Sequence, residues 1–364
     1  KAPAIIDEIG ERVLLVTGKN PDRADILIKE FQALNTMLYI YRVESEPSVS
    51  VIDEGVKLAR ENRCEMVVGI GGGSVIDSAK AIAALAANQG ELLDYLEVIG
   101  KGKKLEQKPL PFIAVPTTAG TGAEASKNSV IWSPEHKVKV SLRSPLMFAD
   151  VALVDPELTL SMPPDVTATT GMDALTHLLE TFVSNQSNPF IDNFCREGMR
   201  RIARSLTRAC NNGRDLEARE DMSMASLLGG MALANVKLGA VHGFAGPMGG
   251  MLPVPHGAVC ACLLPAVMQE NFSVLVAENK EDKLKKFDEI GQLLTGKPGA
   301  GAKDGISWVK DRIVELKIPG LAEYGLSEND FPELIKKAKK ASSMKGNPVV
   351  LDDAGLNSIL TKSA

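Results

Sequence analysis

The sequence predicts an α/β domain with a parallel sheet, followed by an all-helical domain. Up to about residue 158, short apolar runs alternate with amphipathic segments, which is the pattern of repeated β-α-β units. Beyond that point, strand signals nearly vanish and long segments rich in Ala, Leu and Met follow. The expected domains are therefore residues 1–158 and 159–364, and a length of 364 residues also favours two domains.

The strands of the first domain are expected at the apolar runs of residues 13–17, 37–43, 65–71, 111–116 and 151–156, with helices over 22–34 and 51–60. These runs are apolar without alternation, as in strands that helices cover on both faces. Residues 129–132 and 137–142 flank a Ser-Pro-Glu-His turn and predict a hairpin with an exposed His136.

A glycine-rich turn follows the third expected strand. Gly71-Gly72-Gly73-Ser74 leads through Asp77 to an Ala-rich helix over residues 81–88. Glycines let the backbone approach a ligand, Ser74 and Asp77 have the capping-box spacing, and a helix N-terminus presents unpaired N–H groups. The pattern indicates a pyrophosphate site, although a turn that binds nothing has the same sequence signature and Ser74 departs from the usual fingerprint.

A second small-residue loop, Thr117-Thr118-Ala119-Gly120-Thr121, follows the fourth expected strand. Open parallel sheets bind their ligands at the carboxyl ends of strands, so this loop is a further candidate for cofactor contact. A flexible turn remains the alternative.

The helical domain is expected to contain helices over residues 165–183, 189–211, 214–235, 256–272, 280–294, 303–316 and 329–342. It also holds three of the four histidines. Asp173 and His177 are four residues apart and leave the same face of a helix, while His242 and His256 each precede a glycine. One carboxylate and three imidazoles suit Fe²⁺ or Zn²⁺, although a single histidine on an apolar helix is more often a hydrogen-bonded core residue than a ligand.

The composition argues against several partners. A net charge of −5 without a basic stripe predicts no nucleic-acid binding. No apolar run approaches the ~20 residues of a membrane helix, and the N-terminus lacks a signal pattern. The cysteines form no C-x-x-C pair and indicate reduced thiols; Cys260 and Cys262 would lie on different helix faces and are not counted as ligands. We therefore expect a cytoplasmic protein that binds neither nucleic acid nor membrane.

Taken together, these motifs resemble the iron-containing (group III metal-dependent) alcohol dehydrogenase family over essentially the whole chain. The resemblance rests, in order, on the stretches Gly71–Lys80, Pro116–Gly122 with Glu124, Val154–Pro156, Met162–Pro164, Gly171–His177, His242–Gly257 and Ser343–Pro348.

This resemblance implies a dehydroquinate synthase-like fold and a function. The enzyme would be an alcohol dehydrogenase or aldehyde reductase that transfers hydride between NAD or NADP and a small alcohol or carbonyl compound bound to Fe²⁺ or Zn²⁺, in a homodimer or larger homo-oligomer. By similarity, the metal ligands, which carry the catalysis, are Asp173, His177, His242 and His256. The cofactor-binding residues are Gly71, Gly72, Gly73, Ser74, Asp77, Thr117, Thr118, Thr121, Asn128 and Lys139. Lys80 either reaches the cofactor or is a solvated helix lysine.

Two departures from the family pattern affect the prediction. Gly246 stands where many members have a histidine to which a proton-relay role is often given. After the first strand, Gly18-Lys19-Asn20 lacks the Asp that often selects NAD, and Lys19 can attract a 2′-phosphate, so we expect NADPH to be accepted at least as well as NADH.

Other functions remain as alternatives. A maleylacetate reductase-like keto-acid reductase or a hydroxyacid–oxoacid transhydrogenase would use the same residues. A dehydroquinate synthase-like lyase also joins these two domains, but no Lys or Arg lies between His242 and His256 to hold an anionic substrate. A structural protein on a decayed scaffold is disfavoured because all four ligand positions are filled.

Overall fold

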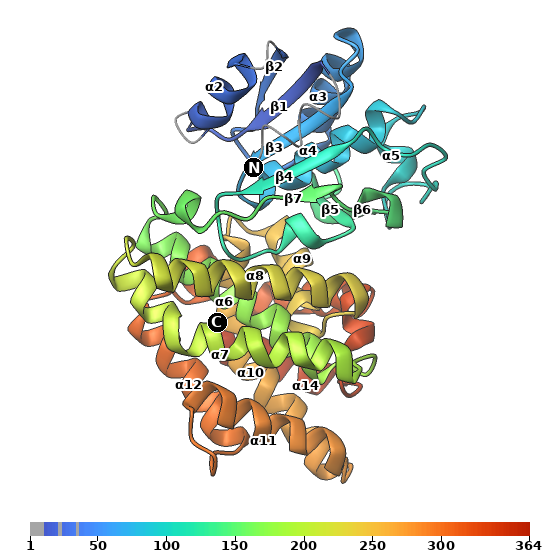
Figure 1. Ribbon diagram of the computed structural model, residues 1–364. Coiled ribbons are helices and arrows are strands. Elements are labelled where there is room, and N and C mark those ends of the chain that lie inside the picture. The colour runs from blue at the N-terminus through green and yellow to red at the C-terminus, as the bar shows by residue number, and fades with distance from the viewer. Residues whose placement is uncertain (1–10, 21–23, 34–35) are drawn as a thin grey trace. The chain divides into compact units, whose positions relative to one another are not determined.

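The computed structural model describes residues 11–20, 24–33 and 36–364 (Figure 1). The chain forms two compact units. Unit 1 comprises the residues up to Thr118 together with Ala123–Thr159, and unit 2 comprises Ala119–Gly122 and Leu160–Ala364. A parallel sheet organises unit 1 and helices build unit 2, so the predicted fold class is confirmed.

Unit 1 is built on a five-stranded sheet with the order β2-β1-β3-β4-β7. All neighbouring pairs are parallel. The strands are β1 (Arg12–Thr17), β2 (Met37–Arg42), β3 (Met66–Gly71), β4 (Phe112–Pro116) and β7 (Val151–Ala152). The central strands β3 and β4 are buried along their whole length, which explains their unbroken apolar sequence. β7 is shorter than predicted because Pro156 starts a 3₁₀ helix, η4 (Pro156–Thr159).

Helices and a hairpin complete unit 1. They are α2 (Asp25–Ala33), α3 (Val49–Glu61), α4 (Gly73–Ala86), α5 (Leu92–Tyr95), the 3₁₀ helix η2 (Ala123–Ala125), and the strands β5 (Asn128–Ser133) and β6 (Val138–Arg143). The hairpin is antiparallel and His136 is exposed at its turn, as predicted. The predicted helix over 22–34 lies partly outside the described residues, and its described part forms α2.

Helix α4 begins at Gly73, earlier than the sequence predicted. Gly72 is its N-cap, so Ser74 and Asp77 lie inside the helix and the predicted capping box is wrong. The backbone N–H groups of Val75 and Ile76 both donate to the Gly72 carbonyl, which closes the first turn. The Asp77 carboxylate instead accepts a hydrogen bond from the backbone N–H of Val130 at 3.0 Å. Asp77 therefore holds α4 to β5.

Lys80 lies in the core of unit 1, so it is not the solvated helix lysine that the sequence allowed. Its ammonium group binds protein oxygens and not a cofactor. Its side chain is 1% exposed. Its ammonium donates to the carbonyl oxygens of Ala123 at 2.7 Å, Ser126 at 2.8 Å and Asn128 at 2.9 Å. Burial lowers the pKa of Lys80 to about 8. The lysine therefore joins α4 to η2 and to the start of β5.

The buried carboxyl group of Glu124, on η2, makes the stability of unit 1 depend on pH. Its side chain is 4% exposed, and burial raises its pKa from 4.5 to about 7 against the opposing effects of a backbone hydrogen bond and Lys80. The folded protein therefore binds more protons than the unfolded chain between these pH values. The stabilising contribution is complete below pH 4.5 and is lost as the pH rises through 7.

We expect Glu124 alone to lower the free energy of unfolding of the metal-free protein by up to about 3 kcal/mol over this window. Glu124→Gln should show a smaller fall, since its amide does not titrate. Urea unfolding followed by circular dichroism at stepped pH measures both. Burial also raises the pKa of Asp77, to about 6. Asp77 therefore lowers the free energy of unfolding in the same direction as the pH rises, and it is present in both proteins. Equal slopes for the two proteins would contradict the role of Glu124.

Unit 2 is helical throughout its main elements. These are α6 (Pro164–Val183), α7 (Pro189–Asn211), α8 (Leu216–Asn235), α9 (Ala240–Met251), α10 (His256–Ala277), α11 (Glu281–Thr295), α12 (Ala302–Glu315), α13 (Phe331–Ala338) and α14 (Asp353–Ser363). The sequence predicted all of them except α9 and α14. Helix α9 contains repeated glycines and Pro247, which disfavour helices, but Val241, Phe244 and Met248 are fully buried. Packing outweighs local propensity there.

Helix α10 is longer and more apolar than the sequence predicted, since no apolar segment was expected to approach the length of a membrane-spanning helix. By length and composition it can cross a membrane, with a mean hydropathy of 1.6. Helices α8 and α9 pass the same test only as a pair that is bent by 98°. Within unit 2, 61% of the apolar window of α10 is buried against other helices. Packing in a helical core therefore accounts for its apolar character.

Candidate metal centre

Helices α6, α9 and α10 bring the four predicted metal ligands together inside unit 2. Asp173 and His177 lie one turn apart on α6, His242 lies in the first turn of α9, and His256 begins α10. Asp173 Oδ1 lies 3.8 Å from Nε2 of His177, 3.5 Å from Nε2 of His242 and 3.7 Å from Nε2 of His256. Two ligands of a tetrahedral ion, each about 2.1 Å from it, are about 3.4 Å apart. The spacing found here is close to that value.

The buried polar atoms of this cluster fit a cation. Among the described residues, Asp173 Oδ1, the atom that the three Nε2 atoms approach, is buried and has no hydrogen-bond partner. An unpartnered carboxylate oxygen in a protein interior is costly unless an ion satisfies it. Burial alone would raise the pKa of Asp173, but the neighbouring imidazoles hold it well below its usual range. Burial lowers the pKa of His177 to about 4, so its ring is neutral at pH 7 and able to bind a metal.

Glu180 orients His242, and the sequence analysis missed it. Its carboxylate lies 2.7 Å from Nδ1 of His242 and also accepts the backbone N–H of Val241 at 2.7 Å. With Nδ1 donating to this carboxylate, Nε2 is the nitrogen that faces Asp173, 3.5 Å from its Oδ1. A carboxylate behind a metal-binding imidazole is the usual outer-shell arrangement. Its sequence signal was available, because Glu180 follows His177 by three residues on α6 and so shares its face.

We expect Glu180→Gln to weaken metal affinity by roughly 10–100-fold, because the amide cannot replace the charged acceptor of His242 Nδ1–H. Competition with a chelator of known affinity measures the change. Glu197→Gln is the matched control and should bind metal normally, because Glu197 lies on α7 with 45% of its side chain exposed and pairs with Arg201 away from the histidines. Unchanged affinity in Glu180→Gln would show that the carboxylate does not support the site.

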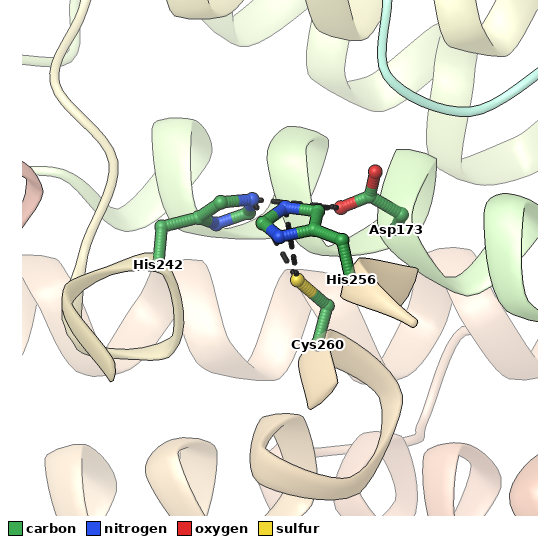
Figure 2. Close-up of side chains that lie close together, drawn as sticks. All are labelled: Asp173, His242, His256 and Cys260. Carbon is green, nitrogen blue, oxygen red and sulfur yellow. Dashed lines mark hydrogen bonds and ion pairs between the residues drawn. The ribbon is translucent and has the colours of Figure 1, made fainter. Parts of the chain in front are cut away.

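Cys260 also faces this cluster, although the sequence interpretation left it out of the ligand set. Figure 2 shows its sulfur beside the two imidazoles of α9 and α10, 3.8 Å from His242 Nε2 and 3.7 Å from His256 Nε2. The ligand atoms of Asp173, His242, His256 and Cys260 all lie within 4.8 Å of one another. Burial raises the pKa of the Cys260 thiol to about 12. Cys262 points elsewhere and donates to the Pro319 carbonyl at 3.3 Å.

The predicted dinucleotide residues of unit 1 gather at the carboxyl ends of β3 and β4. Gly71 and Pro116 are register partners, and the backbone N–H of Thr117 donates to the Gly71 carbonyl at 2.8 Å. A Cβ at position 71 would lie 2.5 Å from a Val75 methyl, so only glycine fits there. A Cβ at Gly72 would lie 3.2 Å from Thr118 Cγ2. The turn and the threonine loop thus adjoin the N-terminus of α4, where Gly73 and Ser74 begin the helix.

The remaining predicted cofactor residues have other surroundings. The Asn128 carbonyl accepts a hydrogen bond from Lys80. Lys139 Nζ lies 3.1 Å from a Glu46 oxygen, and 9% of its side chain is exposed. Thr121 belongs to the short segment Ala119–Gly122 of unit 2. The structure therefore brings Thr117 and Thr118 to the glycine turn and engages Lys139 in an ion pair.

Comparison with known proteins covers both units. A family model described as iron-containing alcohol dehydrogenase matches residues 1–156, and one described as the C-terminal part of the Fe-containing alcohol dehydrogenase family matches residues 167–364. The 1,3-propanediol dehydrogenase of Klebsiella pneumoniae is 35% identical over an alignment of 363 positions that covers 95% of this chain and 92% of that protein. The choline dehydrogenase of Bacillus subtilis (strain 168) is 34% identical over 337 residues, 92% of this chain and 82% of that protein. A crystal structure of a 1,3-propanediol oxidoreductase superposes with a TM-score of 0.91 at 32% identity, covering 100% of this chain and 94% of that one.

Proposed function

Since the chain belongs to the iron-containing alcohol dehydrogenase family and is an oxidoreductase of that type, we propose that it transfers hydride between NAD(P)(H) and a small alcohol or carbonyl compound at a divalent metal. The observation that carries this proposal is the approach of three imidazole nitrogens to the buried, unpartnered Oδ1 of Asp173. Asp173, His177, His242 and His256 would hold Fe²⁺ or Zn²⁺, both of which accept this donor set.

A metal bound there would supply a Lewis acid for the substrate oxygen, and a nicotinamide dinucleotide would supply or accept the hydride. The protein's own residues do the positioning. Glu180 fixes the ring of His242, and α6 fixes Asp173 and His177 one turn apart. His256 retains 36% exposure of its side chain, whereas Asp173 is almost fully enclosed. His256 is therefore the most exposed of the four proposed ligands, which favours approach of a small molecule from its side.

The glycine turn of unit 1 supports a dinucleotide. Gly72 caps α4, a helix of 14 residues, and the first-turn N–H groups at its N-terminus favour a pyrophosphate. Position 71 requires glycine because of Val75, and Thr118 lies against Gly72. Gly71, Gly72, Gly73, Ser74, Thr117 and Thr118 are the proposed contacts in this unit. Asp77 would act indirectly, through the hydrogen bond that holds α4 to β5.

We expect NADPH to be used at least as well as NADH. Lys19 is exposed directly after β1, and Arg42 at the end of β2 is the register partner of Thr17 at the end of β1. Two cations at the ends of adjacent strands favour a 2′-phosphate. In Lys19→Asp the ratio of kcat/KM for NADPH over NADH should fall by about 10–100-fold, the value of one charged hydrogen bond. A strong preference of the unaltered protein for NADH would contradict this expectation.

One assay tests the function as a whole. The purified protein is stripped of metal, restored with Fe²⁺ or Zn²⁺, and followed by oxidation of NADPH or NADH with small aldehydes and keto acids. Metal-dependent turnover is the expected result, and none with either metal would contradict the proposal. The relatives are named for choline and 1,3-propanediol, which favours small alcohols and their aldehydes. Turnover of keto acids alone would support a keto-acid reductase, and coupled turnover without net loss of cofactor would support a transhydrogenase.

A further inference from the structure

We propose that Cys260 is an additional metal ligand, and that its sulfur biases the site toward Zn²⁺. The inference rests on the proposed metal-dependent function and adds a donor to it. Cys260 would bind through Sγ together with Asp173, His242 and His256, whose ligand atoms lie within 4.8 Å of one another and of the sulfur. The thiol proton is released to solvent when the sulfur binds, as for any cysteine ligand.

The distances around the sulfur fit a shared ion. Sγ of Cys260 lies 3.8 Å from His242 Nε2 and 3.7 Å from His256 Nε2. An ion about 2.3 Å from sulfur and about 2.1 Å from nitrogen, with a tetrahedral angle, separates these two atoms by about 3.6 Å. The sulfur therefore already stands at a ligand's distance from two of the proposed ligand atoms.

A second observation points to the same ion. A carboxylate oxygen of Asp173 lies within 4.8 Å of this sulfur, and Asp173 Oδ1 is buried and has no hydrogen-bond partner among the described residues. Asp173, on α6, and Cys260, on α10, thus approach one small volume from different helices (Figure 2). A cation between them would satisfy the carboxylate oxygen, and a bound cation also deprotonates a coordinating thiol.

The position of Cys260 on α10 explains how it reaches the cluster. It follows His256 by four residues, so the two side chains leave the same face of the helix, one turn apart. Cys262, two residues further on, leaves a different face and contacts Pro319. Both thiols are buried, yet only Cys260 has two imidazole nitrogens and a carboxylate around it.

A sulfur donor changes the choice of metal. Carboxylate and imidazole ligands alone suit both Fe²⁺ and Zn²⁺, whereas a soft thiolate ligand raises the affinity for Zn²⁺ relative to that for Fe²⁺. Loss of an outer-shell partner already costs roughly 10–100-fold in affinity. We therefore expect Cys260→Ser to weaken Zn²⁺ binding by at least about tenfold and to weaken Fe²⁺ binding less.

Cobalt spectroscopy tests the ligand without an activity measurement. The metal-free protein is titrated with Co²⁺, whose d–d bands report binding and whose near-ultraviolet thiolate charge-transfer band reports a Co–S bond. The unaltered protein and Cys262→Ser should show both sets of bands. Cys260→Ser and Cys260→Ala should keep the d–d bands and lose the charge-transfer band. X-ray absorption of the Zn²⁺ form should show a sulfur at about 2.3 Å that is lost in the Cys260 variants.

The possible results separate this inference from the proposed function. Binding of Co²⁺ without a charge-transfer band, or a band that persists in Cys260→Ser, overturns the sulfur ligand and leaves the metal centre standing. Absence of any Co²⁺ binding overturns the metal centre and the inference together. Persistent d–d bands in the Cys260 variants show that the site remains folded, so loss of the charge-transfer band is then specific to the sulfur.

Discussion

Replacement of Asp173 by alanine is expected to abolish metal-dependent turnover while leaving unit 2 folded. Asp173 Oδ1 is the atom that all three imidazole nitrogens approach, at 3.5–3.8 Å. Without this carboxylate, the site loses the ligand around which the imidazoles gather and keeps the three imidazoles and the Cys260 sulfur. A Lewis acid contributes several kcal/mol to the stabilisation of developing charge, so kcat/KM should fall by roughly 10³-fold or more.

The fold should survive because Asp173 Oδ1 makes no hydrogen bond among the described residues that its removal would break. Metal content, kcat/KM and the circular dichroism spectrum are measured on the same preparation. Asp165→Ala, in the exposed first turn of the same helix α6, serves as the control and should keep its metal. Undiminished activity of a chelator-stripped Asp173→Ala protein would refute the metal assignment.

The parallel sheet could be predicted from the sequence because its strands are buried on both faces. Runs such as Leu14–Val16 and Val67–Ile70 carry no polar residue, and their short length distinguishes them from a buried helix such as α10. The start of α4 was misplaced for a local reason. A glycine N-cap leaves no side-chain signal, so Ser74 attracted the cap assignment while Gly72 actually holds it.

Helix α9 shows a different limit. Its glycines and Pro247 predict a loop by propensity, and only its burial in the core of unit 2 makes it helical. The histidine it carries was identified from chemistry and not from helical spacing. Asp173 and His177, in contrast, could be paired from sequence because both lie on one continuous helix.

Long-range contacts account for the missed members of the candidate site. Glu180 meets His242 across 62 residues of chain. Cys260 was compared with Cys262, whereas the relevant spacing was the four residues back to His256. Periodicity identifies which side chains share a helix face. It does not identify which faces of different helices meet, and this site is assembled from three helices.

The same limit applies to Lys80, whose replacement by methionine is expected to destabilise unit 1 by about 3–5 kcal/mol. Methionine fills a similar volume, so the change removes the charge and its donors without a large cavity. The hydrogen bonds from the Lys80 ammonium to four oxygens are then lost: those to the carbonyls of Ala123, Ser126 and Asn128, and the one to the Ser126 hydroxyl at 3.0 Å. The Ala123 carbonyl keeps longer bonds from the Ser126 hydroxyl at 3.2 Å and backbone N–H at 3.3 Å. Apolar replacement of a buried ion is neutral only when its partners are replaced as well, and here they remain in place.

Chemical denaturation of the metal-free protein, followed by circular dichroism, measures this loss. Lys57→Met is the matched control, because Lys57 lies on α3 with 74% of its side chain exposed and a loose ion pair to Glu61. Its stability should change by no more than about 0.5 kcal/mol. Equal stability of Lys80→Met and the unaltered protein would mean that water or backbone shifts satisfy the carbonyls at little cost. Lys80 would then not be what holds α4 to η2 and β5, and Asp77 with its bond to Val130 would be left as the connection.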